Sequence, residues 1–185
     1  MNRRVTAALT AVVLLLLGTG AAVAATGPSL RGDGPAAVTG TPASGVFEIG
    51  GRTVRQIRYV DRGTLGYSFR LVNDGALPVT VEGLVVPAHE PRLFEHLRLV
   101  DAEGAERFTV PARGAVPVEL QLLMTGCETL SARAGSFVTE ATLAVSGPMG
   151  LGSGETTVQL PEEVRAGSPR EAGCANATAT SRPPG

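Results

Sequence analysis

The amino-acid sequence predicts an all-β domain, and three observations carry this prediction. Apolar and polar residues alternate in several short segments, as they do in a strand that buries one face. Turn-forming dipeptides separate these segments, and no segment has the periodicity of an amphipathic helix. We count seven to nine short strands, which indicates an antiparallel two-sheet sandwich or a barrel.

The N-terminal segment, residues 1–25, has the features of an export signal. Arg3 and Arg4 precede an apolar stretch that ends in four leucines. Small residues then lead to Ala24 and Ala25, and signal peptidase is expected to cleave between these two alanines. The alternative is an uncleaved signal anchor, because residues 5–25 carry no charge and have about the length of a transmembrane helix.

Both alternatives place the rest of the chain outside the cytoplasm, either secreted or at the cell surface, or as the external domain of a single-pass membrane protein. The formal net charge of the 185-residue chain is -1. Loss of Arg3 and Arg4 would make it more acidic, which argues against nucleic acid as a partner. Membrane contact is expected only through the N-terminal segment, if it is not cleaved.

Two further segments are rich in small residues and flank the predicted domain. Residues 26–45 are dense in Gly and Pro, and this composition predicts a linker. Residues 166–185 have a similar composition and are predicted to be a C-terminal extension that is tethered through Cys174 and disordered after it. The β domain is therefore expected to span residues 46–165.

The predicted strands follow one another from residue 57 to residue 160. Two have unbroken alternation: Leu65, Tyr67, Phe69 and Leu71, and Val116, Val118, Leu120, Leu122 and Met124. A third contains Phe137, Ala141, Leu143 and Val145, and looser patterns contain Val79, Val81 and Val85, Ile57 and Tyr59, Leu97 and Leu99, Phe108 and Val110, and Val158 and Leu160. These registers predict that Tyr67, Phe69, Phe108 and Phe137 lie in the core.

Turn signals lie between the strands. Asn73-Asp74-Gly75 can supply the left-handed residues of a tight turn between two strong strands. Glu103-Gly104 and Arg113-Gly114 mark two further turns. Gly147-Pro148 and the glycines at 150–154 predict a hairpin before the last strand.

Residues 67–81 carry a resemblance to a known kind of domain. A strand with alternating apolar residues ends in Asn73-Asp74-Gly75, and the Val79-Thr80-Val81 strand follows. This stretch, with the later segment 108–120 and the two cysteines, resembles the immunoglobulin-like domains of uncharacterised exported actinobacterial proteins. The resemblance covers roughly residues 46–174 and implies an immunoglobulin-like or fibronectin-like sandwich outside the cytoplasm. It brings no catalytic residues with it.

The two cysteines, Cys127 and Cys174, are predicted to form one disulfide, because an exported chain passes through an oxidising compartment. The chain-entropy model gives about 4 kcal/mol of stabilisation for a loop of this length. A redox or metal-binding pair is the alternative, although the Cys-x-x-Cys spacing of such pairs is missing.

His89 and His96 are the only histidines, and the residues between them form the densest cluster of possible metal ligands. The segment misses both zinc-protease patterns by one position. Leu93 stands where His-Glu-x-x-His needs its second His, and Arg92 stands where His-x-x-Glu-His needs its first. A charged connecting loop, with Leu93 and Phe94 turned inward, is the competing interpretation. His89 and His96 remain the candidate ligands for copper or zinc.

The remaining motifs predict no enzymatic activity. Gly152-Ser153-Gly154 is not preceded by the Gly that a nucleophile elbow needs, and no helix follows to make a phosphate loop. We therefore expect no catalytic residue and no cofactor. The function predicted is that of an exported, non-enzymatic immunoglobulin-like protein of the cell envelope, which contacts an unknown envelope or surface protein. The alternative is an envelope copper- or zinc-binding protein that uses His89 and His96.

Overall fold

The computed structural model describes residues 28–89, 93–125, 135–150 and 152–167, and these form ten β-strands. The strands are β1 (Leu30–Thr39), β2 (Ser44–Ile49), β3 (Arg52–Ile57), β4 (Thr64–Asn73), β5 (Val79–Val85), β6 (Phe94–Asp101), β7 (Phe108–Val110), β8 (Ala115–Met124), β9 (Ser136–Ser146) and β10 (Gly154–Ala166). One short 3-10 turn, Pro148–Gly150, precedes β10.

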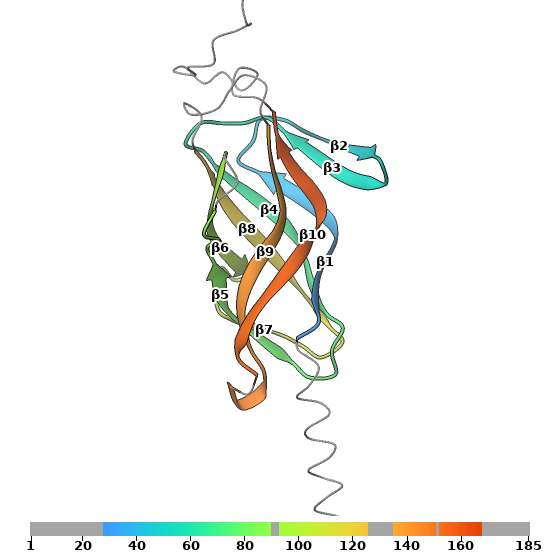
Figure 1. Ribbon diagram of the computed structural model, residues 1–185, viewed down its shortest axis with the longest axis vertical. Helices are drawn as coiled ribbons and strands as arrows, with labels where there is room; N and C mark the ends of the chain where they lie inside the picture. The colour runs from blue at the N-terminus through green and yellow to red at the C-terminus, as the bar shows by residue number, and fades with distance from the viewer. Residues whose placement is uncertain (1–27, 90–92, 126–134, 151, 168–185) are drawn as a thin grey trace, which may run out of the picture.

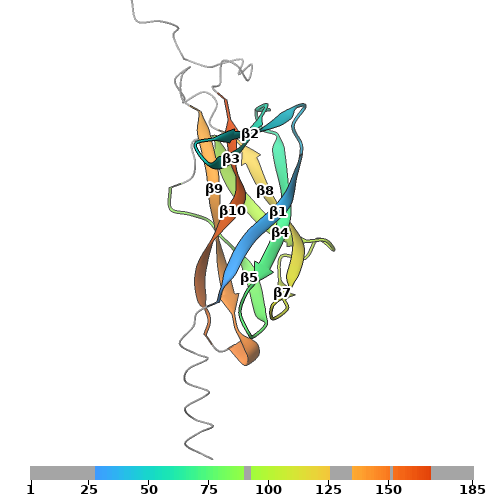
Figure 2. The same cartoon turned by 90° about the vertical axis from the view of Figure 1, so that its right-hand side faces the viewer.

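The strands form two sheets that pack face to face. One sheet has the order β1-β4-β8-β6, and the other has the order β2-β3-β10-β9-β5-β7. Figure 1 shows the β2–β3 hairpin extending from one end of the molecule, and Figure 2 shows β9 and β10 on the side opposite β1, β4 and β8. The predicted all-β sandwich is confirmed, with ten strands in place of seven to nine. The pairing of β3 with β10 is parallel, whereas the other pairings are antiparallel.

The core lies between the sheets, and its two longest alternating patterns are those of β4 and β8. Leu65, Tyr67, Phe69 and Leu71 point inward from β4, and Val118, Leu120, Leu122 and Met124 do so from β8. Phe108 is also buried, as predicted, and so are Leu93 and Phe94. Strict alternation is reliable here because a strand with one solvated face must keep its apolar residues in a single register.

The prediction of a linker at residues 26–45 is wrong for most of its length. Residues 30–39 form β1, which pairs with β4, and β2 begins at Ser44. A bulge interrupts the alternation in this strand: Asp33 pairs with Arg70 and Ala37 pairs with Ser68, so the three residues 34–36 of β1 lie opposite the single residue 69 of β4. The bulge contains Gly34 and Pro35, which are accommodated at such an irregularity on an edge strand.

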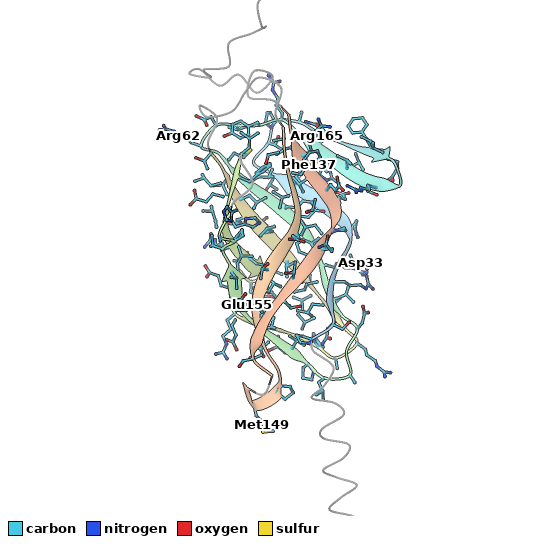
Figure 3. The ribbon with its side chains drawn as sticks, viewed as in Figure 1. Asp33, Arg62, Phe137, Met149, Glu155 and Arg165 are labelled. Carbon is cyan, nitrogen blue, oxygen red and sulfur yellow. The ribbon has the colours of Figure 1, made fainter. Side chains whose placement is uncertain are left out.

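Bulges also reverse two predicted side-chain directions. A register shift between His96 and Arg98 in β6 leaves Leu97 42% exposed, whereas Leu99 stays buried. In β9 the inward positions change phase between Val138 and Ala141, so Phe137 faces outward and is 46% exposed. The prediction that Phe137 lies in the core is therefore wrong. Its ring lies under the Arg165 guanidinium, 5.2 Å from the ring centroid (Figure 3).

Asn73-Asp74-Gly75 forms a turn, but it differs from the one predicted. None of these three residues has a positive φ, and the turn carries the chain from one sheet to the other, since β4 and β5 lie in different sheets. The Asn73 side chain holds the turn, because its Oδ1 accepts a hydrogen bond of 2.9 Å from the Gly75 amide. The predicted turns at Gly104 and Arg113 and the β9–β10 hairpin are confirmed.

Several predictions concern residues outside the described ranges. They include the signal or anchor at residues 1–25 with its Ala24–Ala25 cleavage site, the cysteines Cys127 and Cys174, and the C-terminal extension beyond residue 167. Within the described ranges, no helix has the length and apolar character that a bilayer crossing requires.

Candidate binding groove

A shallow groove of about 600 Å³ lies on the outer face of the four-stranded sheet. Its floor comes from outward-facing side chains of β4 and β8. Ala37 of β1 and Val100 of β6 extend this floor. Pro35 of β1 lies at one rim, and Arg98 and the turn after β6 lie at the other. Because the backbone of β4 and β8 is already paired within the sheet, the groove offers mainly side chains to a ligand.

Strand register aligns the side chains that line the groove in rows across the sheet. The middle row runs from Ala37 in β1 through Ser68 in β4 and Glu119 in β8 to Val100 in β6. Ala37 and Ser68 are small, and the hollow lies over them, between Arg70 in one neighbouring row and Gln121 and Arg98 in the other. Val100 is 7% exposed although it lies outside the main core, so it forms part of an apolar floor.

The second row explains a glycine within a strong alternating strand. Thr39, Gly66, Gln121 and Arg98 pair successively across the four strands. A Cβ on Gly66 would lie 2.5 Å from Thr39 Oγ1 and 2.9 Å from Glu119 Oε2. The missing side chain therefore lets the Glu119 carboxylate lie close over the β4 backbone at Gly66.

Hydrogen bonds fix the orientation of these polar side chains. Gln121 Nε2 donates to Glu119 Oε1 at 2.7 Å, and Arg98 Nε donates to Gln121 Oε1 at 2.8 Å. Glu119, Gln121 and Arg98 thus form a chain of contacts that runs from β8 to β6. Because each side chain is held by its neighbour, less side-chain entropy is lost when a ligand binds.

A second polar chain borders the other side of the hollow. Arg70 in β4 is paired with Asp33 in β1, and Arg31 contacts Asp33 at 3.5 Å and Asp74 at 2.9 Å. The hydrogen bond from Arg70 is the largest cause that lowers the pKa of Asp33 below its ordinary value. Pro117, which pairs with Arg70, completes this row. The groove therefore lies between two chains of polar contacts, and each contains both cations and anions.

The two walls depend on backbone irregularities. The bulge in β1 brings Pro35 to the rim of the groove. On the opposite side, Asp101 Oδ1 accepts hydrogen bonds from the amides of Glu103 (3.1 Å) and Ala105 (2.8 Å), and Gly104 has φ 84°. These contacts hold the turn after β6 so that Asp101, Ala102 and Gly104 line the groove.

The sequence did not predict this groove, because only its reactive residue types, His and Cys, were considered as candidate functional residues. The groove contains Arg, Asp, Glu, Gln and Ser side chains, and none of its described lining residues is His or Cys. One signal was available. Gly66 interrupts the outward face of the clearest predicted strand, and an isolated Gly in a strand often marks a close approach.

The residues predicted as metal ligands lie in different environments. His89 is exposed in the segment after β5, whereas His96 is 6% exposed and lies in β6 opposite Leu122. The three residues 90–92 between them are outside the described ranges. Over the part of the chain that the structure describes, no group of three or more His, Cys, Asp or Glu side chains is close enough to hold a metal ion.

Comparison with known proteins does not indicate a ligand or a function for the groove. No protein-family model matches the sequence, and no curated protein matches it. A structural-genomics target designated SoR45 is similar over 79% of this chain and 92% of its own, with 13% identity and a TM-score of 0.38. The cupredoxin domain of amoB from Nitrosocaldus yellowstonii is similar over 65% of each chain, with 20% identity and a TM-score of 0.27. At such TM-scores neither likeness transfers a function to this chain.

Proposed function

We propose that the chain is an exported, non-enzymatic immunoglobulin-like protein of the cell envelope, and that it binds an envelope or surface protein through the groove on the four-stranded sheet. The N-terminal sequence supports the location, and the two-sheet architecture is compatible with the immunoglobulin-like resemblance of residues 67–81. The observation that carries the binding proposal is the hollow above Ala37 and Ser68, bordered by prearranged polar side chains of both signs.

The chemistry of the groove favours an extended polypeptide segment as the ligand. Small and apolar residues on the floor, among them Ala37 and Val100, can receive a side chain of modest size. Arg98 and Arg70 can bind carboxylates of a segment that crosses the rows, and the Glu119 carboxylate can accept hydrogen bonds from its amides. A segment with an apolar residue between polar or charged neighbours would match this order.

A matched pair of variants tests the proposal. Ser68→Arg fills the hollow from an outward-facing position, and Thr157→Arg makes a comparable change on an exposed position of β10 in the other sheet. A photo-cross-linking amino acid at Ala102, an exposed position on the rim of the groove, should capture one envelope protein from native cells. Capture should be lost in the S68R background and kept in the T157R background. Equal capture in both backgrounds would contradict binding through the groove.

The location is tested on the same material. N-terminal sequencing of protein from the native envelope should begin at Ala25 if the signal is cleaved. A chain that begins at its first residues and fractionates with membranes would support the anchored alternative. Recovery of the intact chain from the cytoplasmic fraction would contradict export.

A further inference from the structure

The β2–β3 hairpin exposes apolar side chains on both of its faces. Val46, Phe47 and Ile49 are 47%, 54% and 55% exposed, and Val46 points to the face opposite that of Phe47 and Ile49. In the described part of the chain, β2 pairs with β3 alone and is the edge of the six-stranded sheet. The hairpin extends away from the sandwich (Figure 1), so its edge can be approached. An apolar edge strand of this kind is a template for pairing with another strand.

The backbone polar groups of three β2 residues point to the open edge. The Ala43 carbonyl accepts a hydrogen bond of 2.9 Å from the Arg58 amide, so Ala43 faces β3. Residues along an antiparallel strand alternate between its two neighbours, and the β2–β3 register contains no shift. Gly45 and Phe47 therefore also face β3, whereas Ser44, Val46 and Glu48 present their amide and carbonyl groups outward.

We propose that β2 pairs in antiparallel fashion with β2 of a second copy of this chain, about a two-fold axis at Val46. This pairing joins the two six-stranded sheets into one continuous sheet. It uses all three outward-facing residues, because Val46 pairs with the partner's Val46 and Ser44 pairs with the partner's Glu48. The proposal concerns a different surface from the groove and does not depend on the function proposed for it.

The side chains of β2 are complementary to one another in this register. Phe47 lies opposite the partner's Gly45, and its ring already packs over Gly45 of its own chain, with Cε2 only 3.2 Å from the position of an added Cβ. A bare glycine beside an aromatic ring on the neighbouring strand is a favourable cross-strand arrangement. Glu48 accepts from Thr53 through Oε1, which leaves Oε2 for the hydroxyl of the partner's Ser44.

Neighbouring registers match less well. A shift by one residue would place paired side chains on opposite faces of the joined sheet. A two-fold axis at Phe47 would instead place the Glu48 carboxylate opposite the partner's Val46.

A second copy is also the partner that the exposed residues of β2 favour. Its strand presents an apolar residue on each face, as β2 requires, and the only charge on β2, that of Glu48, has a hydroxyl opposite it.

The joined surface is small, so the association is weak. Stable dimers bury about 1,200–2,000 Å² in total, and two six-residue strands bury less than this. We expect a concentration-dependent dimer. Sedimentation of the purified full chain from about 5 to about 500 µM should show an average mass that rises toward twice the monomer mass.

Two variants make the mass measurement specific. Val46→Lys should keep the chain monomeric over the whole range, because a charge is placed against its own copy at the two-fold axis. Val86→Lys is the control, since Val86 is 55% exposed and lies outside the hairpin. It should dimerise as the wild type does. A wild type that remains monomeric, or equal behaviour of V46K and V86K, would overturn the proposal.

Cysteine cross-linking tests the register. Under mild oxidation, V46C chains should link to each other through the introduced cysteines, because the two positions are opposite one another at the axis. I49C chains should link much less, since Ile49 lies three positions away from the axis. Peptide mapping identifies the linked positions and separates them from the native cysteines. Faster linking of I49C than of V46C would exclude a two-fold axis at Val46.

Discussion

Arg55 and Glu162 form a two-contact ion pair that joins β3 to β10. Arg55 Nη2 lies 2.9 Å from Glu162 Oε1, and Arg55 Nε donates to Oε2. The same Nη2 donates to the Ala36 carbonyl of β1 at 3.1 Å, so the guanidinium also links the two sheets. Each of the two charged side chains is 12% exposed, and this burial separates the pair from the surface ion pairs of the domain.

Removing one member of this pair should destabilise the domain strongly. Glu162→Gln leaves the Arg55 charge largely buried without its counterion, and we expect a loss of about 2–4 kcal/mol in the free energy of unfolding. Arg52→Ala is the matched control, because Arg52 is 72% exposed and pairs with the neighbouring Glu163. It should cost less than about 0.5 kcal/mol. Urea denaturation measures the free energy of unfolding of both variants. Equal losses would show that the buried pair stabilises the domain no more than the exposed one.

Tyr67 should make the domain sensitive to alkaline pH. Its hydroxyl is buried and has no hydrogen-bond partner among the described residues, and burial, followed by the negative charge of Glu162, raises its pKa. The unfolded chain therefore loses this proton first. The contribution of Tyr67 to the free energy of unfolding is therefore fully present below about pH 10. Above this pH the free energy of unfolding falls by up to about 1.4 kcal/mol per pH unit.

Tyr67→Phe tests this sign. The variant should be as stable as the wild type at pH 7, or more stable by up to about 1 kcal/mol, because it removes an unsatisfied hydroxyl. It should also lose less stability between pH 10 and pH 11.5 in denaturant titrations. Thr157→Ser, at an exposed position of β10, is the control and should retain the wild-type slope, because neither side chain titrates in this range. A slope unchanged in Y67F would assign the alkaline loss to other groups.

Asn73 should be difficult to replace. Its side chain is fully buried, and Nδ2 donates to the carbonyls of Leu77 (2.8 Å) and Val110 (3.3 Å), while Oδ1 accepts from the Gly75 amide. Asn73→Ala leaves these groups without partners and should cost about 2–4 kcal/mol. Asn73→Asp should cost at least as much, because it places a carboxylate oxygen against two carbonyls. Asp74→Asn, at an exposed position, is the control, and its free energy of unfolding should stay within about 0.5 kcal/mol of the wild type. Urea denaturation measures all three variants, and a similar loss in N73A and D74N would contradict the prediction.

Gly40 and Gly50 should respond differently to alanine although both have positive φ, 75° and 60°. A Cβ on Gly40 would overlap the backbone carbonyl of Thr64, which cannot move aside, whereas nothing lies within 4 Å of one on Gly50. We expect G40A to cost about 3 kcal/mol or more and G50A to cost about 1 kcal/mol. Thermal or chemical melts compare them directly, and similar losses would show that strand β4 yields at Thr64.

The parts of the fold that the sequence predicts are those with regular alternation. β4 and β8 lie side by side in one sheet, each with one buried and one solvated face, so their apolar period survives in the sequence. Tyr67 and Leu120 could therefore be placed in the core with no knowledge of topology. Gly104 and Arg113 could be placed in turns for a similarly local reason, because their dipeptides favour the required backbone conformation.

The parts that the sequence does not predict depend on partners distant in the chain. β1 is a strand because β4 pairs with it, although Gly34 and Pro35 give it a linker's composition. Phe137 faces outward because the strand changes phase two residues later, where β10 carries extra residues opposite β9. The groove has the same origin, since its walls are a bulge and a turn, and the small floor residues Ala37 and Ser68 come from different strands.

The position of β10 has a consequence for the order in which the domain assembles. Among the described strands β10 is the last along the chain, yet it lies between β3 and β9 in the interior of its sheet. The amino-terminal hairpin can join that sheet only after roughly 100 further residues have been made, a separation that slows folding. Whether the chain leaves a ribosome or a translocation pore amino end first, the strand that completes the sheet arrives last. Until then β3 and β9 each present an unpaired edge, so the domain is most exposed to proteases and to mispairing just before β10 has been made.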